Sequence, residues 1–90
     1  MDARVRKAVS SKINEAVTSA GEIRQIQDSL KNIPGSQKAD FAFGIAIGRI
    51  YNSFHYQTRR VLGRNATDKE FAEFLEILSN SADRIREACQ

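Results

Sequence analysis

The sequence predicts an all-α protein, an antiparallel three-helix bundle with a long first helix and a central second helix. Apolar residues recur at three- and four-residue spacing along most of the chain, and no stretch alternates as a strand does. A single proline and five glycines leave few positions where a helix must end. For 90 residues we expect one domain, spanning positions 1–90.

The first helix is predicted over about residues 3–31. Its apolar and small residues follow steps of four and three, which favours near-antiparallel packing against a neighbouring helix. The repeat consists of Val9, Ile13, Ala16, Ala20, Ile23, the polar Gln27 and Leu30. The helix is expected to end before Pro34, because proline lacks an amide hydrogen and biases the residue before it away from helical angles.

The second helix is predicted over about residues 37–62, with Ser36 or Asp40 as its cap. Gly63 suits the left-handed conformation that follows many helix ends. Two apolar stripes run along this helix, and we expect them to pack against the first and third helices. One contains Phe43, Ile47, Ile50, Phe54 and Val61, and the other contains Gly44, Gly48, Tyr51, His55, Thr58 and Leu62.

The third helix is predicted over about residues 68–88. Thr67 and Glu70 stand at the spacing of a capping box, in which each side chain bonds the backbone amide of the other residue. A narrow apolar stripe follows, formed by Phe71, Phe74, Leu75, Leu78, Ala82, Ile85 and Cys89. Short connections between three helices favour an up-down-up order.

Charge and cysteine content narrow the class of protein. The net charge is +3, but residues 32–66 hold five basic side chains and one acidic one, whereas residues 67–90 hold three and six. Because opposite charges can attract within one bundle, this balance is weak support for nucleic-acid binding. With the single cysteine Cys89, an N-terminus unlike a signal peptide and no long apolar stretch, we expect a cytoplasmic protein without membrane association.

No constellation of residues predicts catalysis. His55 is the only histidine, and its place on an apolar stripe favours a packed, hydrogen-bonded side chain over a ligand. Neither a second histidine nor a second cysteine stands at metal-binding spacing. We therefore expect no enzyme activity, no catalytic residue, no cofactor, no metal and no small-molecule substrate.

The second helix carries the main candidate for function. Gly44 and Gly48 permit either close packing inside the bundle or a self-association surface. Large apolar side chains also point away from the packed stripes of this helix. We therefore predict a small non-enzymatic interaction or assembly module, a homodimer or the partner of another protein, with an interaction surface formed by Phe41, Ile45, Asn52, Tyr56 and Arg59.

The alternative function is that of a nucleic-acid-binding accessory protein. Arginine forks bind phosphates well, and the second helix could present a basic face to a nucleic acid. The candidate phosphate-binding residues are Arg49, Arg59, Arg60 and Arg64. The competing interpretation is a solvated arginine face that pairs with acidic neighbours.

Overall fold

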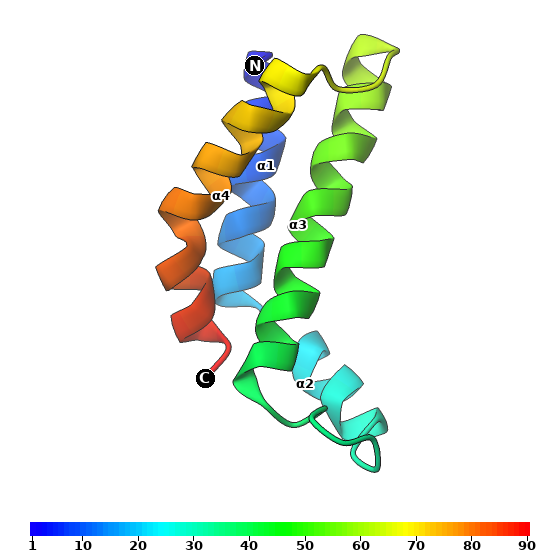
Figure 1. Cartoon of the computed structure of the whole chain (residues 1–90), viewed down its shortest axis with the longest axis vertical. Helices are drawn as coiled ribbons and strands as arrows, with labels where there is room; N and C mark the ends of the chain where they lie inside the picture. The colour runs from blue at the N-terminus through cyan, green and yellow to red at the C-terminus, as the bar shows by residue number, and fades with distance from the viewer.

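The computed structural model describes residues 1–90 and contains four helices and no strand. They are α1 (Ala3–Thr18), α2 (Gly21–Ser29), α3 (Ala39–Leu62) and α4 (Asp68–Ala88). The chain reverses direction between α1 and α3 and again between α3 and α4, while α2 projects from one end of the bundle (Figure 1). Helix α3 contacts the other three helices, and α1 also contacts α4. The all-α prediction is confirmed.

The predicted count of three helices is wrong, because the chain breaks within the expected first helix. Helix α1 ends at Thr18, and Ser19 leaves helical geometry at φ −130° and ψ 63° before α2 begins at Gly21. The Thr18 hydroxyl donates a hydrogen bond to the Asn14 carbonyl, a contact that bends helices, and serine and glycine are weak helix formers. The change of direction brings Ile23 of α2 into the buried core, where it is 2% exposed.

The connection from α2 to α3 is held by side chains that bond its backbone. Buried Ser36 donates its hydroxyl to the Leu30 carbonyl at 2.6 Å, and the Gln27 amide donates to the carbonyls of Ser36 and Lys38. Helix α3 begins at Ala39. The residue at its N-cap position is Lys38, whose side chain makes no capping hydrogen bond. The expected cap by Ser36 or Asp40 is wrong, because the Ser36 hydroxyl stabilises the loop instead.

The start of α4 is as predicted. The Glu70 amide donates to the Thr67 hydroxyl at 3.1 Å, and the Thr67 amide donates to the Glu70 carboxylate at 2.9 Å. Arg64 binds the same carboxylate with both terminal nitrogens, at 2.7 and 3.2 Å. Gly63 adopts the left-handed conformation at φ 69°. The Arg64 guanidinium, and then the Thr67 amide, lower the pKa of Glu70 to about 2.

This lowered pKa predicts a loss of stability in acid. The Glu70 contribution is complete above its ordinary pKa of 4.5 and is lost as the pH falls through about 2. We expect Glu70→Gln to be less stable than the natural chain at about pH 6, with the difference shrinking towards about pH 2. Urea unfolding across this range measures the difference. Glu76→Gln, which removes an exposed carboxylate without an ion pair, is the matched control, and a constant Glu70→Gln difference would contradict the prediction.

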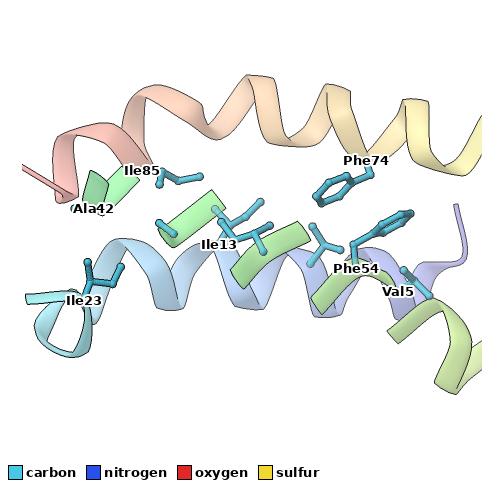
Figure 2. Close-up of a cluster of buried hydrophobic side chains, with 10 residues drawn as sticks. Val5, Ile13, Ile23, Ala42, Phe54, Phe74 and Ile85 are labelled. Carbon is cyan, nitrogen blue, oxygen red and sulfur yellow. The ribbon is translucent and has the colours of Figure 1, made fainter. Parts of the chain in front are cut away.

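The core runs along the bundle and draws on all four helices. Figure 2 shows Phe54 and Phe74 facing each other near Val5 at one end, with Ile85, Ala42 and Ile23 towards the other end. On α3 the most buried residues follow four-residue steps, and they are Ala42, Ala46, Ile50, Phe54 and Thr58. No helix has the length and apolarity that crossing a bilayer requires.

Candidate functional site

One side of α3 faces away from α1 and α4, although Ile45 at its N-terminal part still packs against the core. The buried residues of α3 face α1 and α4, and the five residues predicted as an interaction surface lie on the opposite side at helical spacing. Asn52, Tyr56 and Arg59 are exposed, with Tyr56 at 54%, whereas Phe41 and Ile45 are half-buried. We call this side, together with its two glycines, the outer face; it comprises Phe41, Gly44, Ile45, Gly48, Asn52, Tyr56 and Arg59.

The glycines of the outer face have open space where a side chain would stand. Gly44 and Gly48 are exposed, and a Cβ atom added to either would meet nothing within 4 Å. The interpretation of close packing inside the bundle is therefore wrong. Glycine inside a helix costs about 0.5–1 kcal/mol relative to alanine, and no contact within the chain offsets this cost.

These exposed glycines predict a gain in stability on substitution. We expect Gly48→Ala to raise the free energy of unfolding by about 0.5–1 kcal/mol, because alanine fits the open space and favours the helix. Gly63→Ala is the opposite control, since a side chain at φ 69° is strained and should destabilise the chain. Urea unfolding at low protein concentration measures the stability of both variants. A lower stability of Gly48→Ala would contradict the open space found around Gly48.

Two of the four candidate phosphate-binding arginines are already engaged. Arg49 lies 3.4 Å from Glu15 and 3.7 Å from Glu22, so it joins α3 to α1 and α2. Arg64 is held by Glu70. Arg59 and Arg60 are exposed and make no ion pair. The four arginines therefore do not form one free basic surface.

A polar hollow opens beside the C-terminal half of α3. It has a volume of about 360 Å³ and is lined by Tyr51, Asn52, His55, Arg59, Asn65 and Ala66. A second hollow of about 240 Å³ adjoins it, since Tyr51, His55 and Ala66 line both. The remaining walls of the second hollow come from the start of α4, where Thr67, Asp68 and Phe71 lie.

His55 is positioned by aromatic contacts alone. Its ring centroid lies 4.7 Å from that of Tyr51, 5.0 Å from that of Phe54 and 5.8 Å from that of Phe71, on which it stacks. The expected packing of His55 is observed, but the expected hydrogen bond is absent. The structure holds no group of three histidine, cysteine, aspartate or glutamate side chains that could bind a metal ion.

Two features of the surface have no counterpart in the sequence pattern. The polar hollow depends on the loop residues Asn65 and Ala66 lying across from α3, which no spacing rule predicts. Exposed apolar side chains also occur on α2 and the loop after it, where Ile26, Leu30 and Ile33 are 40%, 37% and 56% exposed. Leu30 was predicted to continue the packed stripe of the first helix.

Comparison of the chain with protein-family models, with curated proteins and with solved structures found no match.

Proposed function

We propose that the protein is a small non-enzymatic assembly module that self-associates through the outer face of α3. The observation that carries the proposal is the pair of exposed glycines, which leave open space on the side of α3 that also holds the half-buried side chains of Phe41 and Ile45. A second helix could approach the backbone closely at Gly44 and Gly48 and cover those side chains. Such contact would offset the helix-destabilising effect of the glycines.

The charges of α3 favour a second copy of this chain as the partner, with the two α3 helices packed antiparallel. Arg59 and Arg60 stand near the C-terminal end of the helix, and Asp40 stands in its first turn. Parallel pairing would bring the arginines of the two copies together, whereas antiparallel pairing separates them and opposes the helix dipoles favourably. Crossing near Gly48 would place Tyr56 of one copy close to the N-terminal part of the outer face of the other.

Sedimentation measured over a range of protein concentrations tests the proposal. We expect a reversible dimer, and we expect Gly48→Leu to weaken dimerisation by at least about tenfold because leucine prevents close approach. Ser10→Leu introduces the same side chain on the exposed side of α1 and should leave the dimer unchanged. A monomer at every concentration, or a Gly48→Leu dimer as tight as the natural one, would refute the proposal.

The nucleic-acid-binding alternative receives less support from the geometry. A phosphate would have to compete with Glu15 and Glu22 for Arg49, and with Glu70 for Arg64. Only Arg59 and Arg60 are free to contribute charge, and two phosphate contacts give weak, salt-sensitive binding. Retention on single-stranded RNA or DNA at low salt, lost in Arg59→Ala plus Arg60→Ala, would favour this alternative over the assembly module.

A further inference from the structure

We propose that the polar hollow is a binding site for a phosphate group, with Arg59 as its charged ligand and Asn52, Asn65 and His55 as further hydrogen-bond donors. This inference does not rest on the assembly function, although Asn52 and Arg59 belong both to the hollow and to the outer face. It rests on how the walls of the hollow are held, on the absence of partners for its polar side chains, and on the geometry of the donors.

The two walls of the hollow are fixed before any ligand binds. Tyr51, His55 and Arg59 follow one another at four-residue spacing, so they project from the same side of α3. The opposite wall is the α3–α4 loop, where Arg64 donates a hydrogen bond to the Asn65 carbonyl at 3.0 Å. The pairing of Arg64 with Glu70 ties this loop to the first turn of α4. A site with walls already in place loses less entropy on binding.

The polar side chains of the hollow have no partners within the chain. The side chains of Tyr51, Asn52, His55, Arg59 and Asn65 make no hydrogen bond or ion pair with other residues, and no carboxylate lines the hollow. Arg49 and Arg64 on the same helix and the loop after it, by contrast, are both neutralised by glutamates. The acidic groups near the hollow are Asp68, which lines the adjoining hollow, and Glu70, whose charge is paired with Arg64.

The donors suit a phosphate better than a carboxylate. A carboxylate has two oxygens in one plane, and a single arginine fork can satisfy both. Here Arg59 provides such a fork, while amide side chains line the hollow from α3 at Asn52 and from the loop at Asn65. A tetrahedral phosphate, with three or more oxygens, can accept bonds from all of these directions. The rings of Tyr51 and His55, which meet edge to face at 75°, then offer apolar contact to the organic part of a phosphate ester.

Nuclear magnetic resonance titrations on the ¹⁵N-labelled chain test this inference, with adenosine monophosphate added at constant ionic strength. We expect saturable shifts of the Asn52 and Asn65 amide signals and at least about tenfold weaker binding by Arg59→Ala. Arg60→Ala removes the adjacent arginine, which does not line the hollow, and should bind within about twofold of the natural chain. Unsaturable shifts, or equal losses in the two variants, would overturn the proposal because they indicate diffuse attraction to positive charge.

A second arm identifies the source of the phosphate. Inorganic phosphate, adenosine monophosphate and a short single-stranded oligonucleotide are compared on the natural chain and on Arg59→Ala. Arg59-dependent binding of the monophosphate assigns the site to a small phosphate ester, and Arg59-dependent binding of the oligonucleotide alone assigns it to a nucleic-acid backbone. If none of the three binds in an Arg59-dependent way, the proposal fails. Because Asn52 and Arg59 also belong to the outer face, the titrations are repeated on Gly48→Leu, in which the proposed dimer is weakened, so that the two proposals fail separately.

Discussion

We expect Phe54→Ala to lower the free energy of unfolding by about 3–5 kcal/mol, the range for removing a buried aromatic ring. Phe54 is fully buried, and its ring stacks on Phe74 with the centroids 4.5 Å apart and the planes 13° from parallel. The Phe71 ring lies 6.3 Å away, so the substitution leaves a cavity where α3 meets α4. Urea unfolding followed by circular dichroism at 222 nm measures the loss.

A loss of this size is a large share of the total stability. Domains of this length unfold with about 5–15 kcal/mol, and each kcal/mol corresponds to roughly 4–8 °C in melting temperature. Tyr56→Ala is the matched control, because Tyr56 lies two residues further along the same helix with a 54% exposed ring. We expect that control to change stability by less than about 0.5 kcal/mol. Similar losses in the two variants would contradict the burial of Phe54.

Local sequence signals predicted the ends of helices where those ends are stabilised by neighbouring residues. The capping box of Thr67 and Glu70 and the left-handed Gly63 are both observed, since each depends on residues only a few positions apart. The break at Ser19 was missed because the apolar repeat continues through it. The turn into α2 is instead favoured by tertiary packing, which buries Ile23 beneath α3.

The sequence placed the packed side of α3 only approximately. Ile50 and Phe54 are buried as predicted, but Phe43 and Val61 are half-buried at the edges. Alanine is compatible with either a surface or a core position, so Ala42 and Ala46 gave no signal, although both are buried in the core. The sequence pattern instead favoured Gly44 and Gly48 as the residues packed inside the bundle. The structure shows the reverse, with alanines inside and glycines on the free side.

The candidate sites depended still more on tertiary contacts. The five residues of the predicted interaction surface share one side of α3, because helical spacing alone determines that arrangement. The four arginines do not act together, since Glu15 and Glu22 reach Arg49 from α1 and α2. The polar hollow requires Asn65 to lie opposite Asn52 and His55, and only the folded α3–α4 connection brings these residues together.

On α3 the alanines are buried and the glycines are exposed. We therefore expect Ala46→Leu to be the second substitution that strongly lowers the free energy of unfolding. Ala46 has no exposed surface, and α1 and α4 pack against that side of the helix. Adding three carbon atoms there forces neighbouring side chains out of their preferred rotamers, at a cost of about 1–3 kcal/mol. Urea unfolding at low protein concentration, where the chain is monomeric, measures this cost without a contribution from assembly.

Gly48→Leu is the matched control for Ala46→Leu, because it tests whether the loss of stability depends on the position of the new leucine. It introduces the same side chain on the same helix two residues later, where nothing lies within 4 Å of the new Cβ atom. The monomer should therefore be as stable as the natural chain or more so, because leucine is a better helix former than glycine. Ala46→Leu should destabilise the monomer, and Gly48→Leu should impair only the dimer. If Gly48→Leu destabilised the monomer as much as Ala46→Leu, the glycines would pack within the bundle and the outer face would not be free for a second copy.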